Sequence, residues 1–162
     1  MRTMSAPAPS AITIVVTDAE ATQRLGARLG ALLQRGDVVG LVGPLGSGKT
    51  TFSQGLAVGL GVGSDRHVAS PTFALVNEHP GRIPFVHADF YRVKNEAELA
   101  ELGLEEAYDR AAAALEWADR FPAIAPEDHL TITFTVQADG SRSLAISATG
   151  VRSAAIVDAL RP

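Results

Sequence analysis

The chain has 162 residues, of which 46% are hydrophobic, and this amount of apolar sequence predicts one globular domain with a substantial core. Its formal net charge of −4 at pH 7 argues against an electrostatic grip on nucleic acid, so any connection with RNA is expected to be indirect. The absence of cysteine excludes disulfides, thiolate metal sites and cysteine nucleophiles.

Residues 1–11 are rich in proline, alanine and serine and are expected to form a disordered tail, which leaves residues 12–162 as a single domain. No apolar run approaches the roughly 20 residues that a membrane helix needs, and the N-terminus lacks a charged-then-apolar signal pattern. We therefore expect a cytoplasmic protein without a membrane contact. The four histidines show no i, i+4 spacing, which argues against a zinc site.

The first predicted element is a strand over Ile12–Val16, which is rich in β-branched residues. Thr17 fits the N-cap of a following helix, with Glu20 at the third helical position of a capping box. Leucines then recur at helical spacing, and Gly36 is expected to end this helix. The apolar segment Val38–Val42 predicts a second strand.

A glycine-rich loop follows this second strand and carries the pattern G-x-x-x-x-G-K-[ST] over Gly43–Thr50. Because glycine lacks a Cβ atom, such a loop can bring its backbone N–H groups close to phosphate oxygens. A helix that begins near Lys49 adds N–H groups and the positive end of its dipole to the same anion site. We expect Lys49 to reach the β- and γ-phosphates of a nucleotide and the Thr50 hydroxyl to ligate Mg²⁺.

The second half of the chain predicts further strands and helices. Phe73–Val76 and Ile83–Ala88 read as a hairpin or a neighbouring strand pair around a turn at residues 79–82. Asn95–Arg110 is acidic and helical with a break at Gly103, and Ala111–Leu115 is typical of a fully buried strand. The last expected elements are an antiparallel hairpin and a short closing helix, over Leu130–Val136, Leu144–Ala148 and Ala154–Leu160.

Polar residues near the strand ends are candidates for the rest of a nucleotide site. Glu116 ends the buried strand, where ligands of a sheet gather, and is the best magnesium candidate; the alternative is a carboxylate that merely starts a surface loop. Asp89 could align water or the outer magnesium shell, or be an ordinary loop aspartate. Ser70 and Thr72 could form a γ-phosphate-sensing loop or a plain turn. Trp117, the single tryptophan, is expected to pack in the core.

Four motifs occur along the chain in a fixed order, namely Gly43–Phe52, Ser70-Pro71-Thr72-Phe73, His87-x-Asp89-x-Tyr91-Arg92 and Glu116-Trp117. In this order they resemble the TsaE (YjeE) family, the bacterial P-loop ATPases of the tRNA threonylcarbamoyladenosine (t6A) pathway. The resemblance covers roughly Ile12 to Ile146, nearly the whole domain.

This resemblance implies an α/β fold of the P-loop NTPase type, with three α/β/α layers and a mixed sheet. It implies a magnesium ion held by Thr50 and Glu116, catalytic roles for Lys49, Asp89 and Glu116, and support of hydrolysis by the Ser70–Thr72 segment. The family's partners are TsaD and TsaB, whose threonylcarbamoyl transfer to adenosine-37 of tRNAs that read ANN codons is supported by ATP hydrolysis. The residues implied to contact ATP are Gly43, Pro44, Leu45, Gly46, Ser47, Gly48, Lys49, Thr50 and Thr51.

One position departs from the family pattern, and other functions compete with the ATPase. Many members have aspartate where this chain has Pro44, and proline removes a backbone N–H from the loop. A small-molecule kinase would need an acceptor pocket and an arginine-bearing lid, whereas the arginines here are dispersed. A GTPase would need an Asn-Lys-x-Asp guanine reader, which the sequence lacks. A nucleotide-dependent adaptor that does not hydrolyse ATP would resemble the ATPase in sequence.

Overall fold

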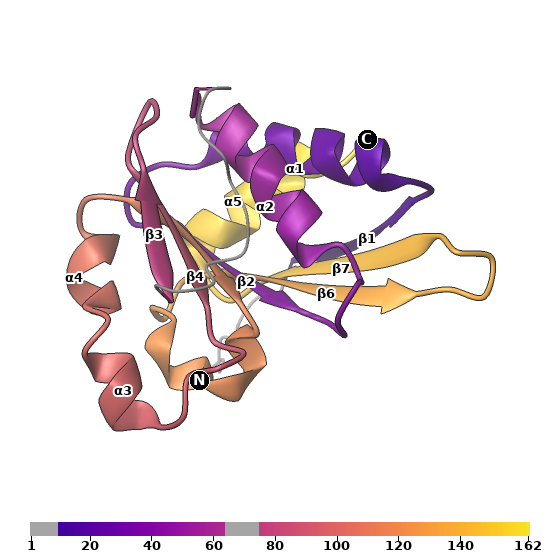
Figure 1. Cartoon of the computed structure of the whole chain (residues 1–162). Helices are drawn as coiled ribbons and strands as arrows, with labels where there is room; N and C mark the ends of the chain where they lie inside the picture. The colour runs from indigo at the N-terminus through magenta and orange to yellow at the C-terminus, as the bar shows by residue number, and fades with distance from the viewer. Residues whose placement is uncertain (1–9, 64–74) are drawn as a thin grey trace, which may run out of the picture.

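The computed structural model describes residues 10–63 and 75–162, which form one seven-stranded sheet covered by helices (Figure 1). The tail before residue 10, together with Ser70 and Thr72 of the predicted phosphate-sensing loop, lies outside the described residues. The strands are, in chain order, β1 (Ala11–Val16), β2 (Val38–Val42), β3 (Val76–His79), β4 (Phe85–Asp89), β5 (Ala112–Glu116), β6 (Leu130–Val136) and β7 (Arg142–Ala148).

The sheet is mixed, as expected, and its strand order is β1-β7-β6-β2-β5-β4-β3. The four central strands β6, β2, β5 and β4 run parallel to one another, whereas β1, β7 and β3 pair antiparallel with their neighbours. Parallel strands place their carboxyl ends at one edge of the sheet, and ligands of open α/β sheets bind outside that edge. The loop after β2 and the last residues of β4 and β5 therefore lie together.

Helices cover both faces of the sheet and complete the predicted three-layer α/β/α arrangement (Figure 1). Val39 and Leu41 of β2 face one core, which is shared with α1 (Ala19–Leu32), α2 (Lys49–Gly59) and α5 (Val151–Leu160). Val38 faces a second core, which is shared with α3 (Glu96–Ala100) and α4 (Leu104–Tyr108). Alternate residues of a buried strand thus serve opposite cores. No helix within the described ranges is long and apolar enough to cross a bilayer.

Helices α1 and α2 pack with their backbones in contact, through two glycines on each helix. A Cβ atom on Gly55 would lie 2.2 Å from the Gln23 carbonyl oxygen, and one on Gly30 would lie 2.3 Å from the Leu56 carbonyl oxygen. Gly26 and Gly59 are equally crowded by the facing backbone. This contact fixes α2, and with it the loop that enters α2, against α1.

The start and the end of α1 differ from the prediction. The N-cap is Asp18, whose Oδ1 accepts a hydrogen bond of 2.7 Å from the Ala21 N–H, and not Thr17. Aspartate is as good a cap as threonine, and the strand β1 continues to the residue before Thr17. The helix ends at Leu32, because Leu33 is extended, and Gly36 with φ 93° serves the turn before β2 instead.

Other element bounds also shift by a few residues. Strand β3 runs from Val76 to His79. His79 therefore pairs in the sheet, whereas the sequence predicted it to lie in the turn. Strand β4 begins after Pro84, which has no N–H to donate, and includes Asp89. Strand β5 extends to Glu116, one residue further than predicted. The two functional carboxylate candidates are therefore the last residues of adjacent strands.

Candidate nucleotide and metal site

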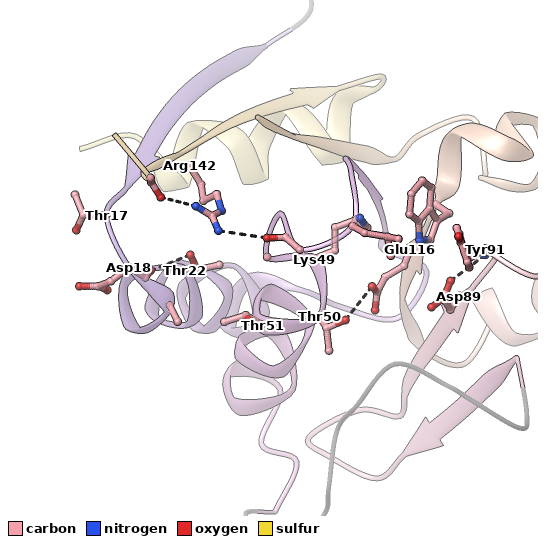
Figure 2. A pocket seen from close by; sticks show the side chains of 16 residues that line it. Thr17, Asp18, Thr22, Lys49, Thr50, Thr51, Asp89, Tyr91, Glu116 and Arg142 are labelled. Atoms are coloured by element: carbon pink, nitrogen blue, oxygen red, sulfur yellow. Dashed lines mark hydrogen bonds between the residues drawn. The ribbon is translucent and has the colours of Figure 1, made fainter. Parts of the chain in front are cut away.

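The glycine-rich loop connects β2 with α2 and turns the start of that helix toward the pocket (Figure 2). Gly46 (φ 77°) and Gly48 (φ 108°) adopt left-handed backbone angles that other residues rarely take. The Pro44 carbonyl oxygen accepts a hydrogen bond of 3.2 Å from the Ser47 N–H. The hydrogen bond that closes this turn therefore uses the carbonyl oxygen of Pro44 and needs no N–H from that residue.

Lys49 is nearly enclosed, with 5% of its surface exposed. Its ammonium group donates hydrogen bonds to the Gly43 and Pro44 carbonyl oxygens, at 2.6 and 2.8 Å. It also lies 4.3 Å from the centre of the Trp117 ring. Burial lowers the pKa of Lys49, and the nearby Glu116 carboxylate opposes this effect. The Lys49 ammonium group is thus held inside the loop by two uncharged carbonyl oxygens. Charged phosphate oxygens would be stronger acceptors and could replace them.

Glu116 is held from two directions. Its Oε1 accepts a hydrogen bond of 3.1 Å from the Thr50 hydroxyl, and its Oε2 accepts a hydrogen bond from His87 Nε2. Only 2% of the Glu116 surface is exposed, and His87 is fully buried on the neighbouring strand β4. The two predicted magnesium ligands, Thr50 and Glu116, are therefore in contact, and a histidine fixes the carboxylate.

Asp89 lies directly opposite Glu116 in the parallel register of β4 and β5. Its Oδ1 accepts a hydrogen bond of 2.9 Å from the Tyr91 N–H. Burial raises the pKa of Asp89, the Tyr91 N–H opposes that effect, and the negative charge of Glu116 adds to it. The end of the sheet therefore gathers negative charge, which a bound cation would offset.

The described residues contain no group of three histidine, cysteine, aspartate or glutamate side chains that could hold a metal ion by itself. Proteins commonly bind Mg²⁺ through one or two carboxylates together with substrate phosphates, and so without such a group. A hydroxyl and a carboxylate beside a phosphate loop provide hard oxygen donors of that kind. Thr50 and Glu116 are thus chemically suited to hold Mg²⁺, and the binding of this ion stays a prediction.

A pocket of about 490 Å³ runs along the loop and the start of α2 (Figure 2). This volume lies within the range typical of small-molecule sites. One end holds Asp89, Tyr91 and Glu116, and the middle holds Lys49, Thr50 and Thr51. The other end is lined by Thr17, Asp18, Thr22 and Arg142. Trp117 lines the pocket with its ring against Tyr91. Gly140 also lines the pocket, and its carbonyl oxygen accepts a hydrogen bond from Arg142. Lys49, Asp89 and Glu116, the residues predicted to be catalytic, thus share one pocket.

Trp117 and Arg142 are among the pocket residues that were not assigned to the site from the sequence. Trp117 packs against the second core, as expected of a tryptophan, but it also lines the pocket beside Lys49 and Tyr91. Arg142 reaches the loop from the β6–β7 hairpin, and its Nη2 donates to the Gly46 carbonyl oxygen at 3.3 Å. These residues are 96 positions apart, so no local pattern in the sequence indicates the contact.

Arg120 is a dispersed arginine that the structure connects with the site. Its Nη1 donates to the Tyr91 and Val93 carbonyl oxygens, at 3.0 and 2.7 Å, and to the Phe90 carbonyl oxygen. These three carbonyls belong to the segment that follows Asp89. Arg120 therefore fixes this segment, and no contact in the described structure places it over the phosphate loop.

Comparisons with known proteins agree with this architecture. The family model of threonylcarbamoyl adenosine biosynthesis protein TsaE matches residues 16–144. The tRNA threonylcarbamoyladenosine biosynthesis protein TsaE of Treponema pallidum is 37% identical over 134 residues, which cover 82% of this chain and 98% of that protein. The protein of the same name from Bacillus subtilis is 38% identical over 135 residues, 82% of this chain and 83% of that protein.

A solved structure resembles the whole described fold. The crystal structure of Bacillus subtilis YdiB superposes with a TM-score of 0.82 and 29% sequence identity, covering 96% of this chain and 97% of that one. The matched sequence spans the phosphate loop, both strand-end carboxylates and most of the sheet. The chain therefore belongs to the TsaE family of tRNA threonylcarbamoyladenosine biosynthesis proteins.

Proposed function

We propose that this chain is an ATPase that binds and hydrolyses ATP with Mg²⁺ and thereby supports threonylcarbamoyl transfer to adenosine-37 of ANN-reading tRNAs. The observation that carries the proposal is the meeting of Lys49, Thr50 and Glu116 in one pocket, at the end of a phosphate-binding loop. Membership of the TsaE family supports the biosynthetic context. TsaB and TsaD are the proposed protein partners.

The loop from Gly43 to Thr51 would bind the phosphates of ATP through its backbone N–H groups and the N-terminus of α2. Lys49 would exchange its two carbonyl acceptors for oxygens of the β- and γ-phosphates. Because the ammonium group is already confined beside the loop, little side-chain entropy is lost when it changes acceptors. Lys49 thus binds the triphosphate and stabilises the charge that develops on it.

Thr50 and Glu116 are the residues that would hold Mg²⁺. When bound, this ion supplies neutralisation of the phosphate charge. His87 would keep the Glu116 carboxylate oriented, since its hydrogen bond occupies the oxygen that does not face Thr50. Asp89 would accept a hydrogen bond from the attacking water, because its carboxylate ends the neighbouring strand and lines the same pocket.

The proposed role of TsaB and TsaD is to complete the catalytic site of this chain. Among the described residues only one arginine, Arg142, lines the pocket, and it contacts the loop from outside. P-loop proteins without a supplied arginine or a fixed water hydrolyse slowly, and completion of the site in trans is worth roughly 10³–10⁵ in rate. We therefore propose slow hydrolysis by the isolated chain and faster hydrolysis in complex with TsaB and TsaD. The net charge of −4 suits contact with protein better than with free tRNA.

The test is a measurement of ADP and inorganic phosphate produced from ATP and Mg²⁺, with and without TsaB and TsaD. Equal amounts of both products, increased by the partners, would support the ATPase. ADP that forms only when a small phosphate acceptor is added would identify a kinase. Nucleotide binding without phosphate release, even with the partners present, would identify a non-hydrolysing adaptor. Tight binding of free tRNA at physiological salt would contradict the proposed indirect role toward RNA.

A further inference from the structure

The strand β1 lies at one edge of the sheet (Figure 1) and, among the described residues, pairs only with β7. It contains no charged residue and no proline, and its register with β7 continues without a bulge. Soluble proteins usually protect an edge strand with one of these features, because open backbone groups are a template for pairing with another strand. The opposite edge strand, β3, is shorter and carries Glu78, which forms an ion pair with Arg110. The β1 edge therefore lacks the protection that β3 has.

The backbone groups of three residues of β1 point to this open edge. In an antiparallel pair, successive residues direct their N–H and C=O groups alternately toward the partner strand and away from it. The Ser10 carbonyl oxygen accepts a hydrogen bond of 3.0 Å from the Ala148 N–H, so Ser10 faces β7. The residues of the strand whose backbone groups point away from β7 are therefore Ala11, Thr13 and Val15. An added strand would form hydrogen bonds with these groups.

The side chains of β1 alternate between the two faces of the sheet. Ile12 and Ile14 are partly buried and pack against the core that is shared with α1, α2 and α5. Thr13 and Val15 lie on the opposite face, where both are exposed, Val15 to 54%. An added strand would remove apolar surface from water on both faces of this edge.

A second copy of β1 matches this pattern. If two β1 strands pair antiparallel around a two-fold axis at Thr13, each Thr13 faces its own copy and each Ala11 faces Val15 of the other copy. All three residues that point outward then exchange backbone hydrogen bonds with the second copy. On the core side, Ile12 lies opposite Ile14 of the other copy, so the two apolar cores continue across the contact.

The strand brings no ionisable side chain into this pairing, so two copies of β1 meet without the like-charge repulsion that blocks many edges. A strand of another protein would fit only if it had the same alternation, whereas a second copy has it by identity. We infer that β1 is the interface of a homodimer in which two copies of this chain join their sheets through antiparallel β1 strands. The inference goes beyond the proposed function, because the contact needs neither ATP nor TsaB and TsaD.

The test measures the mass of the full chain by sedimentation velocity over a range of protein concentrations. A single strand pair is a small interface, so the wild type should form a weak dimer with a dissociation constant on the order of 10 µM. Thr13→Pro removes an N–H that points outward, and edge strands tolerate proline at such positions, so β1 should stay paired with β7. Thr13→Lys places two ammonium groups opposite each other. Each variant should weaken dimerisation by about tenfold or more.

Thr133→Lys is the matched control for charge on the same face of the sheet. Thr133 is exposed and lies in register with Ala145, which in turn lies opposite Thr13. Its strand β6 pairs with β7 on one side and with β2 on the other, so its backbone offers no open edge. This variant should dimerise like the wild type, and circular dichroism should show an intact fold for all variants.

The absence of cysteine from the chain allows the contact to be located with single cysteines. A short thiol-specific cross-linker should join two chains of Thr13→Cys and should not join two chains of Thr133→Cys. A wild type that stays monomeric up to about 1 mM would overturn the inference. Dimerisation that survives both Thr13→Pro and Thr13→Lys would overturn it as well. An equal loss of dimer in Thr133→Lys would also contradict it, because that result indicates stacking of two sheet faces instead of pairing of edges.

Discussion

The Thr50 hydroxyl donates a hydrogen bond of 3.1 Å to Glu116 Oε1, although the two residues are 66 positions apart in the chain. The contact exists because β2 and β5 are parallel neighbours, so the helix that follows one strand begins beside the end of the other. His87 secures the second oxygen of the same carboxylate. Two oxygen donors suited to a magnesium ion are thus positioned by the fold itself.

Replacement of Lys49 by alanine should nearly abolish ATP binding, because the loop loses the ammonium group that is expected to bind the β- and γ-phosphates. Trp117 provides the readout, since it is the single tryptophan and its ring centre lies 4.3 Å from the Lys49 ammonium. In the wild type, ATP should change the tryptophan fluorescence as Lys49 turns toward phosphate. The titration should be flat for Lys49→Ala.

Lys94→Ala is the control for this experiment, because Lys94 is the other lysine of the chain and its side chain is exposed. Its ATP titration should match that of the wild type. Circular dichroism of both variants should show an intact fold. Wild-type affinity in a folded Lys49→Ala variant would refute the assignment of the phosphate site.

Gly55→Ala should destabilise the domain, although alanine normally favours a helix over glycine by about 1 kcal/mol. The added Cβ atom would lie 2.2 Å from the Gln23 carbonyl oxygen of α1, so the two helices would have to move apart. We expect a net loss of about 1–3 kcal/mol in the free energy of unfolding, measured with urea. Val58→Ala on the same helix, where the side chain is 60% exposed, should change stability by less than about 0.5 kcal/mol. If Gly55→Ala and Val58→Ala were equally stable, the close contact between α1 and α2 would not be needed for stability.

Asp89→Asn should stabilise the protein at neutral pH in the absence of nucleotide and magnesium. Burial raises the pKa of Asp89 above its ordinary value of 3.8. Between these two pKa values the folded state therefore keeps a proton that the unfolded state has lost, and above them ionisation costs the folded state more than the unfolded state. The free energy of unfolding of the wild type therefore falls as the pH rises from about 4 through the raised pKa. Asparagine carries no charge and can still accept from the Tyr91 N–H.

Thermal unfolding at neutral pH and at about pH 4 tests this prediction. The melting temperature of Asp89→Asn should exceed that of the wild type at neutral pH, and the difference should shrink at the lower pH. A variant that is less stable than the wild type at neutral pH would show that the Asp89 carboxylate stabilises the fold instead.

Much of the fold could be predicted from the sequence, because local signals mark it. The apolar run that ends at Glu116, the glycine loop before Lys49 and the alternating hairpin around Gly140 each indicate their element without tertiary information. The exact ends of helices and strands were harder to predict, because some of them are set by contacts with residues far away in the sequence. Helix α5 begins at Val151, before the predicted Ala154, because Asp128 accepts hydrogen bonds from two N–H groups of its first turn.

The residues of the candidate site likewise fall into those that a local motif indicates and those that only a long-range contact reveals. Lys49, Thr50 and Glu116 follow from motifs that are each continuous in the sequence, and the structure brings them together, although their roles stay predictions. His87 and Arg142 could not be assigned, because their importance lies in contacts with residues 29 and 96 positions away. Such contacts depend on the strand order, which no spacing in the sequence indicates.

The central claim is that this pocket hydrolyses ATP through a magnesium ion held at Glu116, and Glu116→Gln tests it most directly. Glutamine keeps the shape of the side chain but removes its charge, so nucleotide should still bind while Mg²⁺-dependent phosphate release in the presence of TsaB and TsaD falls by about 10²-fold or more. Glu101→Gln, an exposed carboxylate at the end of α3, should release phosphate at the wild-type rate. Wild-type phosphate release by a folded Glu116→Gln variant would contradict the account.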